Sequence, residues 1–191
     1  MSSSISEFYQ GKNVLVFGST TFPGKVLLEK LLRSCPTIEK IYCPIHPLKK
    51  PGNDHYSPMD TFAEIYASKL FDRVRQINPN FQEQLLPFDL NLFLKPSSMN
   101  STDEEEQVDI TWRKLQNKID LCFYIANNSV DFQEQNLKEM IQTNVMDLKR
   151  ILTFLKTCTQ LKSIVYLSSI YANIGKDLIL SFFGKLPRCS I

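Results

Sequence analysis

The stretch Asn13-Val-Leu-Val-Phe17, followed by Gly18-Ser-Thr-Thr-Phe-Pro-Gly24, decides the fold of this chain. The first part is mostly apolar and rich in β-branched side chains, which is typical of a strand buried on both faces. Beyond the glycine loop, leucine and valine recur at helical spacing over residues 23–33. A strand, a glycine-containing loop and a helix in this order form the first half of a βαβ unit.

Four further apolar runs extend this alternation of strands and helices along the chain. We expect the second strand to end early, at Cys43, or to lie beside a bend, because Pro44 and Pro47 cannot donate to a strand ladder. The pattern predicts an α/β fold, a doubly wound parallel sheet (Rossmann-like) that is truncated after its fifth strand. The later strands are expected at residues 40–43, 85–88, 121–125 and 163–167, helices at 61–75 and 132–157, and a loop at 47–60.

Composition places the chain among single-domain globular proteins and excludes several classes of function. Its 191 residues are 43% hydrophobic, and 22 basic residues face 20 acidic ones. No dense Lys/Arg cluster is available for nucleic acid, and no apolar run approaches the ~18 residues of a membrane span. There is no signal peptide, and the five cysteines form no C-x-x-C pair, so we expect a cytoplasmic chain with reduced thiols. Cys43, His46 and His55 are too few for zinc, and no metal is expected.

The loop from Gly18 to Gly24 occupies the position of a dinucleotide-binding fingerprint. In such a loop the first glycine allows a tight turn, and the last lets the helix pack closely on the strand. Backbone N–H groups at the helix N-terminus then face the pyrophosphate of the cofactor. Because the middle glycine of the fingerprint is missing, the spacing alone is a weak signal.

Several segments, in the same order along the chain, carry a more specific resemblance. They are YQGKNVLVFG (9–18), FPGKVLLEKLLRSCP (22–36), KLFDRVR (69–75), NPNF (78–81), QTNV (142–145) and LSSIYAN (167–173). The sequence resembles the N-terminal part of animal fatty acyl-CoA reductases, within the extended short-chain dehydrogenase/reductase class. We interpret residues 8–173 as a Rossmann-like NADP-binding domain and residues 174–191 as an unrelated C-terminal tail.

The resemblance implies an NADPH-dependent oxidoreductase that reduces a long-chain fatty acyl-CoA to a fatty alcohol in lipid metabolism. Members of this family are much longer chains. After the fifth strand they carry a Tyr-x-x-x-Lys catalytic pair, a substrate region and a C-terminal anchor that places them on the peroxisomal membrane. None of these parts is found in the sequence, so we expect a truncated, degenerate paralogue without the anchor.

The resemblance assigns cofactor contacts to the glycine loop and to three later positions. The family's loop reads TGATGFLG, so Thr21 stands in place of the middle glycine. We expect its branched side chain to crowd the pyrophosphate, and a positive φ at this position would lower affinity by roughly 5- to 150-fold. The assigned residues are Gly18, Ser19, Thr20, Thr21, Phe22, Gly24, His46, Asp89 and Ala126.

The later positions bear on the choice of cofactor. His46, followed by Lys49 and Lys50, matches an arginine that suits the 2′-phosphate of NADP. No acid stands there to hold the ribose of NAD, so the expected cofactor is NADP(H), bound weakly if at all. Asp89 has two interpretations: it borders adenine, or it only caps the turn after its strand.

Catalysis in this class needs a Ser or Thr, a tyrosine as general acid and a lysine four residues later. Ser169 matches the Ser/Thr position, and Asn144 matches an asparagine that supports such sites. None of the seven tyrosines has a lysine four residues on, and Tyr171 and Lys176 are separated by five. We therefore expect a pseudoenzyme that lacks the proton donor for carbonyl reduction.

Three functions stay open from the sequence. The first is the family's reductase activity, with long-chain acyl-CoA as substrate. The second is a non-catalytic module that binds NADP(H). The third has no small-molecule ligand: a protein-interaction module that associates with a full-length homologue, or a non-functional relic.

Overall fold

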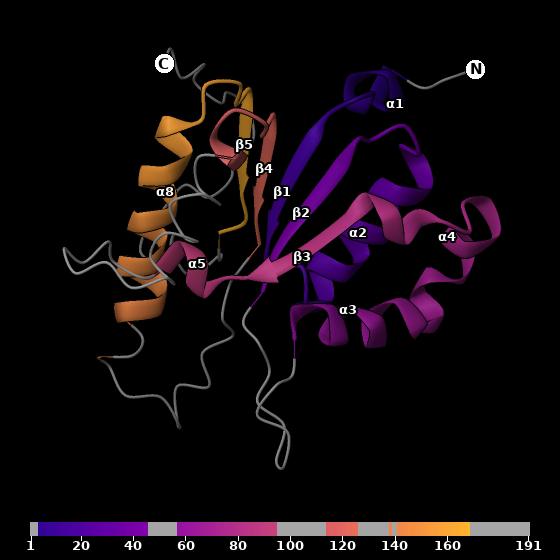
Figure 1. Cartoon of the computed structure of the whole chain (residues 1–191), viewed down its shortest axis with the longest axis horizontal. Coiled ribbons are helices and arrows are strands. Elements are labelled where there is room, and N and C mark those ends of the chain that lie inside the picture. Colours follow the sequence, from indigo (N-terminus) through magenta and orange to yellow (C-terminus); the bar gives the residue numbers. More distant parts are fainter. Residues whose placement is uncertain (1–3, 46–56, 95–113, 126–137, 139–140, 169–191) are drawn as a thin grey trace, which may run out of the picture.

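The computed structural model describes residues 4–45, 57–94, 114–125, 138 and 141–168. In this part of the chain five parallel strands form one sheet in the order β3-β2-β1-β4-β5. Helices flank both faces of the sheet (Figure 1), which confirms the doubly wound, Rossmann-like fold. The strands are β1 (Asn13–Phe17), β2 (Lys40–Ile45), β3 (Leu85–Asp89), β4 (Leu121–Tyr124) and β5 (Ser163–Tyr166).

The side chains of β1 alternate between two hydrophobic cores. Val14 and Val16 enter a core shared with α2, α3 and α4, whereas Leu15 and Phe17 enter a core shared with α8. All four side chains are buried, as expected for a strand covered on both faces. The described helices are α1 (Ser4–Tyr9), α2 (Phe22–Ser34), α3 (Pro58–Ala67), α4 (Asp72–Ile77), α5 (Asn91–Leu94) and α8 (Asp147–Thr157), with the shorter helical turns η1 (Lys69–Phe71), η2 (Phe81–Gln84) and η3 (Gln142–Met146).

Strand β2 extends beyond its expected end, through Pro44 to Ile45. The Leu90 N–H donates to the Ile45 carbonyl (2.8 Å), so the backbone of Ile45 faces β3. Successive residues of a strand face opposite neighbours, and Pro44 therefore faces β1. Pairing between β2 and β1 ends at Tyr42, so the missing N–H of Pro44 removes no ladder bond. The expectation that proline ends this strand was wrong for that reason.

The helix expected at 61–75 is divided into α3, η1 and α4, and it begins earlier than expected. Ser57 caps α3 through a reciprocal pair of hydrogen bonds with Asp60, so the last residues of the expected 47–60 loop belong to the helix start. Ser68 has an extended backbone (φ −68°, ψ 150°), which ends α3. The Arg75 guanidinium donates to the carbonyls of Tyr66 and Ser68, and so holds the broken end of α3.

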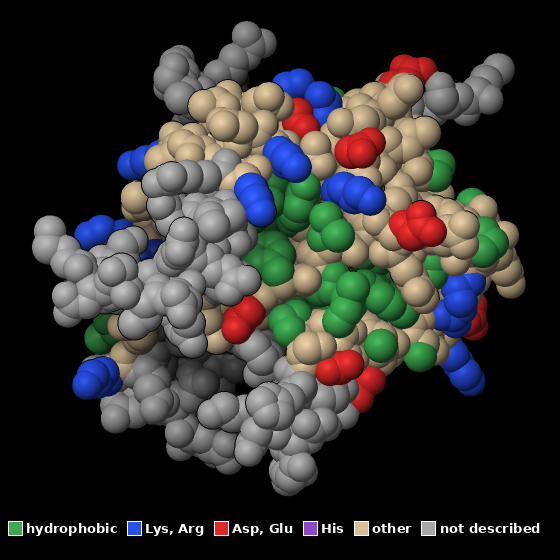
Figure 2. Space-filling model, in the orientation of Figure 1, with side chains coloured by type: hydrophobic (Ala, Val, Ile, Leu, Met, Phe, Trp, Pro, Cys, Tyr) green, Lys and Arg blue, Asp and Glu red, His purple; other side chains and the backbone are tan. Residues whose placement is uncertain are grey.

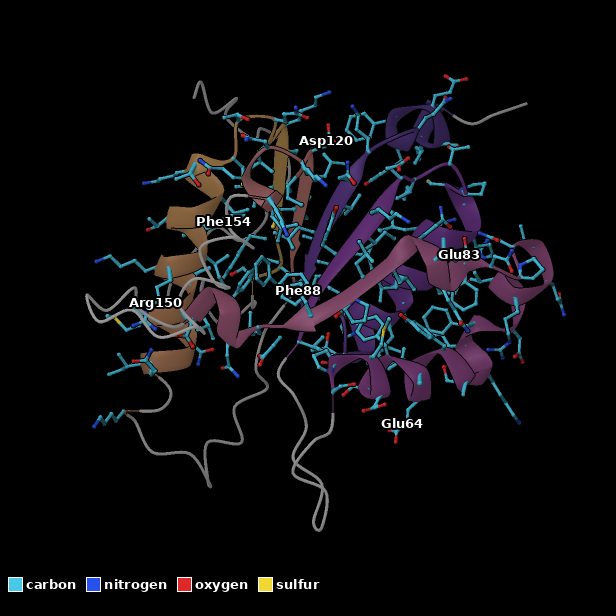
Figure 3. The ribbon with its side chains drawn as sticks, in the orientation of Figure 1. Glu64, Glu83, Phe88, Asp120, Arg150 and Phe154 are labelled. Carbon is cyan, nitrogen blue, oxygen red and sulfur yellow. The ribbon has the colours of Figure 1, made fainter. Side chains whose placement is uncertain are left out.

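The predicted long helix at 132–157 is seen in its C-terminal part. There η3 is a π-helical turn that leads directly into α8. Ile151, Phe154 and Leu155 of α8 are buried against the sheet. At the other side of α8, the Arg150 guanidinium donates to the Leu94 carbonyl of α5 (2.7 Å), and Figure 3 shows Arg150 between these helices.

Polar contacts hold the amino ends of three strands together. The Asp120 carboxylate accepts a hydrogen bond from the Asn13 N–H (3.0 Å) and pairs with Lys12 (3.3 Å). Lys162, just before β5, lies 3.8 Å from the same carboxylate. In Figure 3 Asp120 lies at the end of the sheet opposite to Phe88, which is close to the carboxyl end of β3. The carboxyl ends of the strands, where open α/β sheets bind their ligands, lie at the other end of the sheet.

The two edge strands differ in their surroundings. Figure 2 shows hydrophobic side chains gathered in the middle of the face around β3, with charged side chains around them. At the other edge, Ile164, Val165 and Tyr166 of β5 are 44–50% exposed. A hollow of about 780 Å³ lies between α8 and β5, lined mainly by apolar side chains that include Leu148 and Leu152. Strand β5 therefore presents an apolar edge within the described structure.

A contact between two glycines sets the distance between β1 and α2. Gly18 has a φ of +80°, which a glycine adopts without strain, and it turns the chain directly after β1. Gly24 lies in the first turn of α2, and a Cβ atom added to it would lie 2.1 Å from the Gly18 carbonyl oxygen. A side chain at position 24 is therefore incompatible with the observed packing.

Gly24→Ala is expected to destabilise the protein by about 3 kcal/mol, because the added methyl meets backbone that cannot rotate away. For a domain of this size, that lowers Tm by roughly 6–12 °C in a calorimetric scan. In an unconstrained helix, the same change raises stability by about 1 kcal/mol. Lys30→Ala, at an exposed site of the same helix, should stay within about 0.5 kcal/mol of the wild type. An unchanged or higher Tm for Gly24→Ala would contradict the close contact.

The four described cysteines are free and buried: Cys35, Cys43, Cys122 and Cys158. Burial raises the pKa of the Cys43 and Cys122 thiols far above the usual value, and it raises that of Cys158 to about 11. The thiolate is the reactive form, so these residues are expected to be inert core thiols. This agrees with the reduced thiols expected from the sequence.

With Cys189 replaced by Ser, we expect almost no labelling of the native protein by a thiol reagent at pH 8, and four labels per chain after denaturation. Since the folded state holds its thiol protons more tightly than the unfolded state, stability should also fall as pH rises above the ordinary thiol pKa of 9.0. Rapid native labelling of two or more cysteines would show that the core is open.

Candidate functional site

The glycine loop lies at the carboxyl end of β1, beside the point where the strand order reverses. Strand β1 pairs with β2 on one side and with β4 on the other. The sheet continues from β2 to β3 on the first side and from β4 to β5 on the second. In open α/β sheets, ligands bind in the crevice at such a switch point. The N-terminus of α2 opens at the same end of the sheet as the loop (Figure 1). The structure therefore places the expected phosphate loop where a dinucleotide site requires it.

Thr21 forms the N-cap of α2. Its backbone is extended (φ −70°, ψ 160°), and its side-chain oxygen accepts a hydrogen bond from the Gly24 N–H (3.2 Å). The same hydroxyl donates to the Gly18 carbonyl (2.7 Å), and the Thr21 N–H donates to that carbonyl as well (3.0 Å). The φ of Thr21 is negative, so the condition under which backbone strain would lower cofactor affinity is not met. Threonine fits the backbone here because the N-cap position is extended.

Ser19 is the most deeply buried residue in the middle of the loop. Its side chain is completely buried, and among the described residues its hydroxyl has no hydrogen bond of ordinary geometry. It neighbours the Cys43 thiol of β2, whose pKa is raised by burial and lowered only in part by this hydroxyl. Tyr66 of α3 also approaches Cys43, and burial raises its pKa far above the usual value. Ser19 thus faces the protein interior rather than a ligand.

The remaining described loop residues lie on the outer side. Phe22, the first residue of α2, is 78% exposed, and Thr20 is half-buried. The Phe22 N–H has no hydrogen-bond partner among the described residues, whereas Pro23 has no N–H to offer. An anion at this helix end would meet the Phe22 N–H first.

Asp89 ends β3 next to β2. One of its carboxylate oxygens accepts a hydrogen bond from the Asn91 N–H (2.8 Å), which is the turn-capping role that sequence analysis held open beside an adenine contact. The neighbouring Leu90 N–H donates to β2 at Ile45. The observed hydrogen bonds of this turn are explained by the turn-capping role, and the adenine contact stays a prediction.

An aromatic stack at the carboxyl ends of three strands was missed in the sequence. Phe17, Tyr124 and Tyr166 are the last residues of β1, β4 and β5, and they pair in register. The rings of Tyr124 and Tyr166 stack with centroids 5.3 Å apart, and that of Phe17 lies 5.7 Å from Tyr124. Burial, followed by smaller charge effects, raises the pKa of Tyr124 to about 12. Aromatic residues at the ends of three apolar runs were the available signal, since parallel strands end at one edge.

Asn144 lies in the π-helical turn η3 and lines the hollow between α8 and β5. Such turns are frequent at functional sites. Three other expected site residues, His46, Ala126 and Ser169, lie outside the described residues. Tyr171 and Lys176, which are too far apart for the catalytic pair, lie outside them as well. In the described ranges no three His, Cys, Asp or Glu side chains gather as metal ligands.

Within these same ranges, no helix is both long enough and apolar enough to cross a lipid bilayer. The division expected between residues 173 and 174 also lies outside the described structure, and it stays a prediction.

Comparison with known proteins agrees with this geometry. Residues 16–180 match the model of the male sterility protein family, an NAD-binding family. Mouse fatty acyl-CoA reductase 1 is 36% identical over 176 residues, which are 92% of this chain and 31% of the mouse protein. The chain thus spans about a third of the length of this relative.

Two solved structures share the fold. The reductase domain of a Mycobacterium tuberculosis non-ribosomal peptide synthetase superposes with a TM-score of 0.59 at 18% identity, over 86% of this chain and 34% of that one. NAD⁺-bound xylitol dehydrogenase superposes with a TM-score of 0.50 at 18% identity, over 87% of this chain and 56% of that one. At these identities the likeness concerns the fold alone. The match over residues 16–180 decides the family: the chain belongs to the male sterility protein family, in which it forms a fatty acyl-CoA reductase-like Rossmann domain.

Proposed function

We propose that this chain is an NADP(H)-binding domain of the fatty acyl-CoA reductase type, and that it does not reduce acyl-CoA by itself. One observation carries the proposal. The Gly18–Gly24 contact places an unstrained loop and the N-terminus of α2 at the switch point beside β1 and β4. Backbone N–H groups at a helix N-terminus are a general site for a phosphate anion. The larger relatives suggest a long-chain acyl-CoA as the substrate class of the complete reaction.

The sequence after β2 supports NADP(H) over NAD(H). His46, Lys49 and Lys50 follow this strand, and no Asp or Glu stands among residues 46–53 to bind a free ribose hydroxyl. Cationic side chains favour the additional 2′-phosphate of NADP. The proposed cofactor preference rests on this charge pattern.

The tyrosines support the absence of catalysis. A tyrosine that protonates a carbonyl at neutral pH needs a lowered pKa, which a lysine four residues on supplies in this class. No tyrosine of the chain has such a lysine, and burial raises the pKa values of Tyr66 and Tyr124. Tyr124 and Tyr166 of the aromatic stack lack this lysine, which supports the proposed absence of a general acid.

The proposal is tested by thermal unfolding with NADPH, NADH and no nucleotide. At an NADPH concentration one hundred times Kd, binding should stabilise the chain by about 2.7 kcal/mol, which is a rise in Tm of roughly 5–11 °C. NADH at the same concentration should give a smaller rise. No fatty alcohol should form from palmitoyl-CoA and NADPH. Equal or absent shifts with both nucleotides would contradict the proposed cofactor, and turnover would contradict the proposed inactivity.

A pair of charge variants places the binding site. Phe22→Glu puts a carboxylate at the helix end proposed to hold the pyrophosphate, and like-charge repulsion should weaken NADPH binding about tenfold. Val26→Glu makes the same charge change one turn later, at a site that is also exposed, and should alter Kd far less. Both dissociation constants can be measured by fluorescence titration. Equal losses for the two variants would mean that NADPH binds elsewhere.

The apolar edge at β5 favours a second candidate, association with another polypeptide such as a homologous reductase. Among the described strands β5 lies at the edge of the sheet, and its exposed Ile164, Val165 and Tyr166 lie beside the hollow under α8. An added strand would cover both features. This candidate would be favoured over cofactor binding by a sharp unfolding transition whose Tm does not change with either nucleotide, together with a mass above that of the monomer by light scattering.

A further inference from the structure

The hydroxyl group of Thr21 is engaged on both sides in the described structure. It accepts the Gly24 N–H at 3.2 Å and donates to the Gly18 carbonyl at 2.7 Å. Both partners belong to the glycine pair that fixes the distance between β1 and α2. The hydroxyl therefore lies at the N-terminus of α2, held between the backbone groups of Gly18 and Gly24.

This arrangement leaves few donors for an anion in the first turn of α2. An α-helix begins with four N–H groups that have no partner within the helix. Here the Thr21 N–H bonds to the Gly18 carbonyl, and the Gly24 N–H bonds to the Thr21 hydroxyl. Pro23 has no N–H. Among the described residues, Phe22 alone keeps a free N–H in this turn.

We propose that the Thr21 hydroxyl is an internal ligand that competes with a cofactor pyrophosphate for the Gly24 N–H. Thr21 is then the residue that sets the affinity of the loop for a dinucleotide. This inference rests on the proposed NADP(H) binding. It differs from crowding by the branched side chain, because the competing group is the hydroxyl oxygen and not the methyl.

Three substitutions distinguish competition by the hydroxyl from crowding by the methyl group as the cause of weak NADPH binding. Thr21→Val keeps the branched shape and removes the hydroxyl, Thr21→Ser keeps the hydroxyl and removes the methyl, and Thr21→Gly removes both. Loss of an N-cap hydroxyl corresponds to about a fivefold change in an equilibrium constant. Competition by the hydroxyl therefore predicts that Thr21→Val and Thr21→Gly bind NADPH about fivefold more tightly, with Thr21→Ser close to the wild type.

Thermal unfolding without ligand supplies an independent readout. Thr21→Val should lower Tm because the cap is lost, while Thr21→Ser should not. Thr37→Val is the matched control, because Thr37 is exposed beyond the opposite end of α2. It should leave the NADPH dissociation constant unchanged.

Each result decides between the explanations. Tighter binding by Thr21→Ser but not by Thr21→Val would overturn the proposal in favour of steric crowding. Weaker binding by Thr21→Val would overturn it by showing that the hydroxyl itself holds the phosphate. Should Thr21→Val fail to fold, Thr21→Ser against Thr21→Gly keeps the test, since only competition separates these two. If neither the wild type nor any variant binds NADPH, the proposed function is wrong and this inference falls with it; if all bind equally, only this inference is wrong.

Discussion

The approach of α2 to β1 depends on the absence of two side chains, at Gly18 and at Gly24. A Cβ at position 24 would lie 2.1 Å from the Gly18 carbonyl oxygen, a distance that no folded protein tolerates. Gly18 supplies the positive φ that turns the chain over the end of β1. The turn and the close packing together point the N-terminus of α2 at the crevice between β1 and β4.

Thr21, in the middle of the loop, is constrained by its hydrogen bond at the N-terminus of α2 and not by the close packing of α2 on β1. Because Thr21 lies outside the left-handed region, a side chain there costs no backbone strain. Its hydroxyl satisfies a helix donor, which stabilises α2 in the absence of any ligand. A glycine would leave that donor to an anion. The loop is therefore stabilised by the same hydrogen bond that would have to break for a pyrophosphate to use the Gly24 N–H.

The succession of strands and helices along the chain and the loop position were predictable because buried parallel strands leave short apolar runs in the sequence. Details that depend on which neighbouring strand a backbone group faces could not be predicted from the sequence. The extension of β2 through Pro44 follows from where its pairing with β1 ends. The φ of Thr21 likewise comes from tertiary packing, whereas the Ser57–Asp60 cap of α3 was legible and was overlooked. The aromatic stack was not predicted, because the sequence of one strand does not show which residues of the neighbouring strands pair with it.

The central claim is that a dinucleotide binds at the Gly18–Gly24 loop, and amide NMR during a titration with NADPH tests it most directly. The account predicts that the amide resonances of Phe22 and Gly24 move most, with saturation, while amides near Asp120 at the opposite end of the sheet stay in place. Saturable changes centred on α8 and β5, or no saturable change over residues 18–25, would contradict it.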